Sequence, residues 1–235
     1  LAWLGGFEGS RPVRIGNAAN TQLQLDVFGE VMDVLHHARL AGLEGKGEGW
    51  DVQTALLEHL ETIWREPDQG IWETRGPPRH FTHSKVMAWV AFDRAVQSCE
   101  KFDLRGPVGH WRALREEIRQ EILANGYNPD LGTFTQSYDS RELDAALLLL
   151  PLVGFIDPWD ARMRRTVEAI ERELMWRGLV MRYRTERTDD GVGGGEGVFL
   201  ACSFWLADNL LLLGRRDDAE KLFESLLRLG NDVGL

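Results

Sequence analysis

Apolar residues recur at every third or fourth position along most of the chain, and the alternation typical of strands is rare. This period indicates helices with one buried face. It predicts about eight of them, over residues 23–35, 52–64, 85–102, 111–123, 143–150, 163–175, 199–213 and 217–229. The expected N-caps are Asp51, Thr82 or Ser84, and Asp139 or Ser140. We therefore expect an all-α protein, in which residues 127–138 form a short two-stranded excursion or a long loop.

The predicted helices are of two kinds, which alternate along the chain. Some are apolar on nearly every side (86–92, 143–150, 199–213), and others carry a single apolar stripe (52–64, 111–123, 163–175, 219–229). Inner helices of a double ring touch neighbours on all sides, whereas outer helices do so on one side only. The long loops precede the buried helices, so they gather at one end of such a ring if successive helices alternate in direction. That end is the candidate site.

Composition narrows the class of protein. The chain has 235 residues, 43% of them hydrophobic, and no linker or charge run divides it, so we expect one domain. Its formal net charge of -10 argues against nucleic acid or a membrane surface as partner and favours a neutral or cationic ligand. No secretory leader or membrane span is visible, so we expect a cytoplasmic protein. The missing initiating Met suggests a piece of a longer chain.

The densest polar segment is the loop from Gly70 to Lys85. Its glycines and prolines prevent regular structure, and loops of this kind between packed helices often carry sites. Its candidate site residues are Trp72, Glu73, Arg75, His80 and Lys85. An indole beside a carboxyl favours the protonated form, whereas nearby cations favour the ionised form, and the sequence does not decide between them. The alternative is a surface loop in which Glu73 pairs with Arg75.

Two further clusters are candidates for ligand contact. Asn17, Gln22 and Asp26 lie near the start of the first helix, where amides and carboxylates suit a hydroxyl-rich ligand or cap the helix. Glu196 lies in the glycine-rich run Gly193–Gly197, which lacks the Lys-Ser/Thr of a phosphate loop and is either a flexible contact or a surface turn. The six histidines are scattered, and neither a metal nor another cofactor is expected.

The central loop also resembles a known signature. From Gly70 to Ala95 the chain contains Gly-Ile-Trp-Glu-x-Arg-Gly-x-Pro-Arg-His-Phe-x-x-Ser-Lys-Val-Met-x-Trp-Val-Ala-x-Asp-Arg-Ala. This segment closely resembles glycoside hydrolase family 15, which holds glucoamylases, glucodextranases and bacterial trehalases. Residues 16–26 and 182–197 resemble two further stretches of that family, so the similarity covers essentially the whole chain.

The resemblance implies an (α/α)6 barrel, in agreement with the alternating helices, and inverting hydrolysis of an α-glucosidic bond. In that reaction one carboxylic acid protonates the departing oxygen, while a second carboxylate, roughly 6.5–9.5 Å away, activates water. Glu73 matches the general acid. The substrate-binding roles implied by the resemblance fall to Trp72, Arg75, His80, Lys85, Arg182, Glu196, Asn17, Gln22 and Asp26.

The chain departs from the family in extent. The barrel needs more helices than the pattern supplies, and the Arg-Asp substrate motif and the second catalytic glutamate are absent. We therefore expect residues 1–235 to be part of a single catalytic domain without its N-terminal and C-terminal portions, with the general base beyond Leu235. The alternative is a non-catalytic carbohydrate-binding or structural helical fragment. The sequence leaves open whether the substrate is trehalose or an α-glucan.

Overall fold

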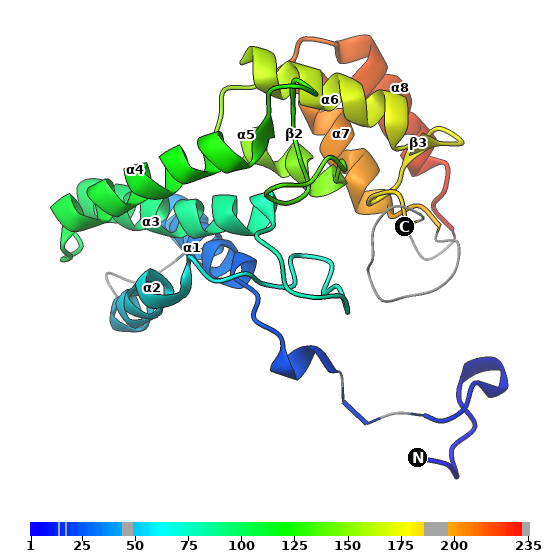
Figure 1. Ribbon diagram of the computed structural model, residues 1–235, viewed down its shortest axis with the longest axis horizontal. Coiled ribbons are helices and arrows are strands. Elements are labelled where there is room, and N and C mark those ends of the chain that lie inside the picture. Colours follow the sequence, from blue (N-terminus) through cyan, green and yellow to red (C-terminus); the bar gives the residue numbers. More distant parts are fainter. Residues whose placement is uncertain (14, 17, 44–48, 186–196, 232–235) are drawn as a thin grey trace.

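The computed structural model describes residues 1–13, 15–16, 18–43, 49–185 and 197–231, and within them the fold is built from α-helices (Figure 1). The helices are α1 (Asp26–Leu40), α2 (Trp50–Ile63), α3 (Thr82–Phe102), α4 (Val108–Asn125), α5 (Leu149–Leu152), α6 (Ala161–Glu173), α7 (Leu200–Leu212) and α8 (Arg216–Leu227). Short 3-10 turns are η1 (Phe7–Gly9), η2 (Ala18–Thr21) and η3 (Ala145–Leu148). Each predicted helix overlaps an observed one, and the all-α expectation is confirmed. No described helix is long and apolar enough to cross a membrane.

Among the residues that the structure describes, strands occur in two small antiparallel hairpins. β1 (Tyr127–Asn128) pairs with β2 (Thr133–Phe134), which confirms the predicted two-stranded excursion. β3 (Met175–Trp176) pairs with β4 (Leu179–Val180). The turn between β3 and β4 places Arg177 and Gly178 at φ 51° and 84°, as a two-residue hairpin turn requires.

α3 is the central helix of the first half of the chain. Every residue from Thr82 to Val96 is buried, because α1 packs on one side and α4 on the other. α1 approaches so closely that a Cβ on Gly29 would lie 2.2 Å from the carbonyl oxygen of Met87. The prediction of a fully buried helix is therefore confirmed for α3.

α7 is less enclosed than its sequence predicts. α8 and η3 pack against it, and Cys202, Leu206 and Leu210 are buried there. Leu211 and Leu212, however, are 56% and 41% exposed. An apolar sequence predicts burial, but in the described residues no element covers that side of α7.

The helix starts differ from the predicted caps. α2 begins at Trp50 after a left-handed Gly49, so Asp51 lies in the first turn, and Thr82 is the first residue of α3. Before η3 the cap is Asp144, which accepts a hydrogen bond from Ala146 N at 2.7 Å; the prediction of Asp139 or Ser140 was wrong. Several short polar residues precede this helical segment, and only the one placed against a free N–H can cap it.

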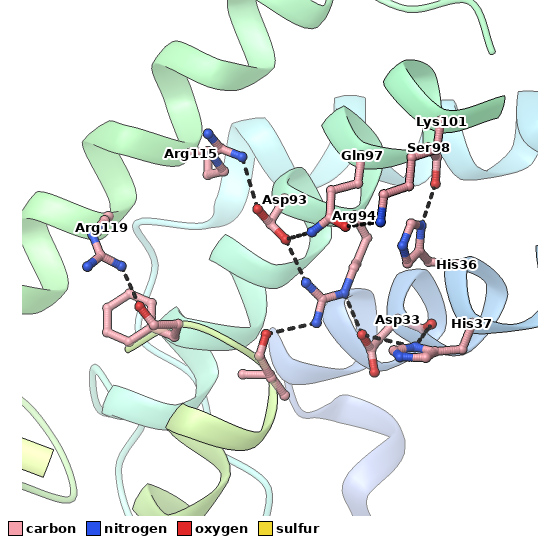
Figure 2. Close-up of polar contacts among 12 residues, drawn as sticks. Asp33, His36, His37, Asp93, Arg94, Gln97, Ser98, Lys101, Arg115 and Arg119 are labelled. Carbon is pink, nitrogen blue, oxygen red and sulfur yellow. Dashed lines mark hydrogen bonds and ion pairs between the residues drawn. The ribbon is translucent and has the colours of Figure 1, made fainter. Parts of the chain in front are cut away.

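A polar network joins the two halves of the chain (Figure 2). Arg94 on α3 donates to Asp33 on α1, to Asp93, and to the carbonyl oxygen of Val153 after α5. Arg119 on α4 donates to the carbonyl oxygen of Phe155, two residues further on. Two helices of the first half therefore hold the turn that follows η3 and α5.

Candidate active site

The loop predicted to carry the site is a compact, hydrogen-bonded turn. Its base is an antiparallel bridge in which Asp68 and Arg79 exchange backbone hydrogen bonds of 2.9 and 2.8 Å. At φ 68°, Gly70 lies against Phe81, whose ring carbons would be 2.9 Å from an added Cβ. Two further backbone bonds, from Glu73 N to Gly70 O and from Thr74 N to Gln69 O, fold the tip.

Glu73 stands exposed at that tip in a left-handed backbone conformation, at φ 50°. Residues other than glycine pay about 1–2 kcal/mol to adopt this region, and such strain tends to be retained at functional sites. The conformation turns the chain sharply between Trp72 and Thr74, which is 5% exposed. Glu73 is thus an exposed residue on a locally strained backbone.

Aromatic side chains and one cation surround the indole of Trp72. Its ring centroid lies 6.5 Å from that of Tyr183, 5.7 Å from that of Phe199 and 6.0 Å from that of Trp205. The guanidinium carbon of Arg182 lies 5.1 Å from the indole centroid, within cation–π range. These residues come from the segment after β4 and from the start of α7, so three separate parts of the chain form one aromatic wall.

The start of α1 is fastened to the same loop. Gln22 Nε2 donates to Thr74 O at 3.1 Å, and Leu25 N donates to a carboxylate oxygen of Asp68 at 3.1 Å. These contacts bring Asp26 near Glu73. Asp26 is 7% exposed, and its pKa is raised by burial and, to a smaller extent, by the charge of Glu73. The structure therefore brings Gln22 and Asp26 close to the segment that carries Glu73.

Asp68 and Lys85 lie beneath the loop, and both are completely buried. Burial raises the pKa of Asp68 to about 6, although the hydrogen bond from Leu25 N and the charge of Lys85 oppose the shift. Lys85 Nζ donates to the carbonyl oxygens of Trp64 and Glu66, both at 2.6 Å, and burial lowers its pKa to about 8. The ammonium of Lys85 thus binds the carbonyl oxygens that follow α2 and joins the start of α3 to the segment that leads into the loop.

The remaining predicted residues occupy different places. His80 is half-buried and stacks on Tyr138, with ring centroids 5.7 Å apart, and burial lowers its pKa. Arg75 is exposed on the loop. Asn17 and Glu196 lie outside the residues that the structure describes.

Sequence reasoning missed Asp144 and Gln136. Trp72 Nε1 lies 3.0 Å from both carboxylate oxygens of Asp144, and Gln136 Nε2 donates to the same carboxylate at 2.9 Å. The available signal was the position of Asp144 directly before the apolar run 145–150, where a cap is expected. Phe199 and Trp205 were missed because their apolar helix was interpreted wholly as core.

The described residues thus form a helical scaffold that carries the exposed Glu73 next to the aromatic wall around Trp72. The chain belongs to the glycosyl hydrolases family 15, whose family model matches residues 1–229. It is 45% identical over 233 residues to a trehalase of Mycobacterium tuberculosis and 40% identical over 230 residues to a trehalase of Thermoplasma volcanium. These matches include 99% and 98% of this chain, but the chain spans only 34% and 37% of the length of the two relatives. The predicted family is confirmed.

Solved structures show the same fold at lower identity. A wild-type glycosidase superimposes with a TM-score of 0.77 at 21% identity, covering 93% of this chain and 57% of the other. A glycosidase variant in complex with glucose gives a TM-score of 0.74 at 21% identity, covering 90% and 55%. The helices described above are therefore arranged as in glycosidases.

Proposed function

We propose that this chain forms the acid-bearing part of an inverting glycoside hydrolase that releases glucose from trehalose or a related α-glucoside. Membership of the family and the relatives named trehalase support this activity. The observation that carries the proposal is Glu73, an exposed carboxyl on a strained loop that is closed by backbone hydrogen bonds and lies beside the wall formed by Trp72 and Arg182.

Glu73 is the proposed general acid, which protonates the glycosidic oxygen as the bond to the anomeric carbon breaks. Trp72 offers an apolar face to the sugar ring. Arg182, Gln22 and Asp26 offer hydrogen-bonding groups to its hydroxyls, since donors and acceptors of several kinds suit a polyol.

The other predicted contacts divide into two groups. Arg75, His80, Asn17 and Glu196 stay proposed substrate contacts. Lys85 is assigned a supporting role, because its ammonium already donates to two carbonyl oxygens beneath the loop. Its effect on a substrate would then be indirect.

The general base belongs, in this proposal, to a part of the protein beyond Leu235. The relatives that the chain matches are much longer than it, since the chain covers 34% and 37% of two of them. Residues 1–235 would then be part of a single (α/α)6 catalytic domain. Inversion requires the two carboxyl groups to stand about 6.5–9.5 Å apart, with room for a water between them.

The location of the protein is also a proposal. Cys99 and Cys202 are both buried free thiols, which is typical of proteins kept in a reducing compartment. We propose a cytoplasmic enzyme that takes a small carbohydrate as its substrate.

The test is the substitution Glu73→Gln in the full-length protein. Loss of general-acid catalysis is expected to lower kcat for trehalose by about 10²- to 10⁴-fold. Glu58→Gln, at an exposed glutamate on α2, is the matched control and should leave kcat unchanged. Full activity of the Glu73→Gln protein would refute the assignment.

The product and the substrate range supply a second readout. An inverting enzyme releases one glucose of trehalose as the β-anomer, which NMR detects before mutarotation. Comparison of kcat/KM for trehalose, maltose and isomaltose identifies the preferred bond. Binding of these sugars without any turnover by the full-length wild-type protein would favour the alternative, a non-catalytic carbohydrate-binding domain.

A further inference from the structure

Asp144 is a buried carboxylate at the junction of several chain segments. It is 4% exposed and lies immediately before η3. Three N–H donors from three places in the chain converge on it: Trp72 Nε1 at 3.0 Å, Gln136 Nε2 at 2.9 Å and Ala146 N at 2.7 Å. The bond to Trp72 joins residues 72 positions apart in sequence.

Two of the three partners, Trp72 Nε1 and Ala146 N, can only donate, so they require an acceptor at residue 144. An amide in place of the carboxylate would keep one acceptor oxygen but would lose the second oxygen and the charge. The charge of Arg182 also favours the ionised carboxylate, and Ala145 N donates to Arg182 O at 2.7 Å. Burial raises the pKa of Asp144, and the three hydrogen bonds and Arg182 oppose that shift.

The contacts of Asp144 are linked to two places on the loop that carries Glu73. Next to the tip of the loop, its carboxylate accepts a hydrogen bond from the indole of Trp72 directly. Where the loop returns to α3, the link runs through Gln136, whose side chain donates to Asp144 and whose carbonyl oxygen accepts a hydrogen bond of 3.0 Å from Thr82 N. The direct contact is therefore the one beside Glu73.

We propose that Asp144 is a positioning residue, which acts on catalysis by holding the Trp72 indole and thereby the Trp72–Glu73 segment in one orientation. The inference rests on the proposed function, since it concerns the same loop and the same acid. It assigns to Asp144 no contact with the substrate; its effect passes through Trp72.

A double-mutant cycle in the full-length protein tests this role. The variants are Asp144→Asn, Trp72→Phe and the double variant, each assayed for kcat and KM with trehalose. Loss of a charged hydrogen-bond acceptor is expected to lower kcat/KM about 10- to 100-fold in Asp144→Asn. In the Trp72→Phe background, which has no indole N–H, the same change should have at most a small further effect. If the loss of kcat/KM in the double variant equals the product of the losses in the two single variants, the two residues act independently and the proposal is overturned.

A capping aspartate elsewhere provides the matched control. Asp160 also caps a helix, accepting a hydrogen bond of 2.9 Å from Arg162 N at the start of α6. Asp160→Asn should lower the thermal unfolding temperature with kcat/KM unchanged. If Asp144→Asn behaves in the same way, its role is structural only and the proposal fails.

A third measurement separates this failure from failure of the proposed function. Trehalose affinity is measured by calorimetry in the Glu73→Gln background with and without Asp144→Asn. If Glu73→Gln proves active, the general-acid assignment fails, yet the cycle between Asp144 and Trp72 can still be read in kcat/KM. If Glu73→Gln is inactive and Asp144→Asn leaves both affinity and kcat/KM unchanged, only the positioning role fails.

Discussion

The guanidinium of Arg94 on α3 donates a hydrogen bond of 2.8 Å to the carbonyl oxygen of Val153, which follows α5. The same group donates to Asp33 and Asp93, both at 2.6 Å, so its charge is paired and its donors point to three segments (Figure 2). Asp93 in turn accepts from Arg115 on α4 at 2.9 Å. Arg94 therefore joins α1, α3, α4 and the turn after α5.

Arg94→Ala is expected to lower the free energy of unfolding by about 3 kcal/mol, the lower end of the range for breaking a buried ion pair. The substitution removes the guanidinium partner of the partly buried Asp33 and leaves Asp93 with Arg115 as its remaining ion-pair partner. Urea denaturation measures the loss. Arg216→Ala is the control, since Arg216 pairs with Glu220 on the exposed face of α8 and should change stability little. If the two substitutions lower the free energy of unfolding equally, the network around Arg94 stabilises the fold no more than an exposed ion pair does.

Acid should weaken the fold through His36. This residue is 2% exposed and bonded to Ser98, and burial, with smaller contributions from Arg94, Lys101 and His37, lowers its pKa from 6.5 to about 4, against the charge of Asp33. The unfolded state then binds a proton more readily than the folded state, so stability falls as pH drops from about 6.5 towards 4. The loss from this group is at most about 3 kcal/mol.

The test compares the pH dependence of unfolding in His36→Asn with that of the wild type. An asparagine cannot gain a charge, so the variant should lose less stability than the wild type between pH 7 and 4.5. Taking the difference between the two proteins cancels the contributions of other groups, such as Asp68. Parallel curves for His36→Asn and the wild type would contradict the expectation.

The left-handed backbone at Glu73 is expected to reduce stability while it keeps the proposed acid in place. Glu73→Gly relieves the left-handed strain at φ 50°, whereas Glu73→Ala keeps it. The glycine variant is expected to be more stable than the alanine variant by about 1 kcal/mol, although both should be inactive. Thermal unfolding of the two proteins measures the difference.

The same pair of substitutions on a regular helix should give the opposite order. At Glu58 on α2, alanine should be more stable than glycine by about 1 kcal/mol. The same preference for alanine at residue 73 would show that the backbone there is unstrained.

The helices could be predicted from the sequence because the helical period is a local property. Each predicted segment overlaps a helix in the structure, and α3 is buried as its apolar residues indicate. The caps could not be predicted as well. Which of several short polar residues meets a free N–H depends on the path of the preceding loop, and at η3 that residue is Asp144.

The site was partly predictable for the same reason. Trp72 and Glu73 belong to one short segment whose composition is unusual in itself, but the partners of Trp72 come from residues 136–144 and 182–205. Lys85 shows the limit most clearly. The family resemblance implied a substrate contact for Lys85, yet its long apolar stem is buried and its ammonium binds carbonyl oxygens, which no local pattern reveals.

The left-handed backbone at Glu73 also has an evolutionary consequence. Glutamate and glycine codons differ by a single nucleotide, so the change that relieves the strain is among the most accessible mutations at this position. A lineage released from the need for a proton donor would gain stability by taking it. Under the proposed general-acid role, the residue found at this position indicates whether a related chain is still under selection for proton donation.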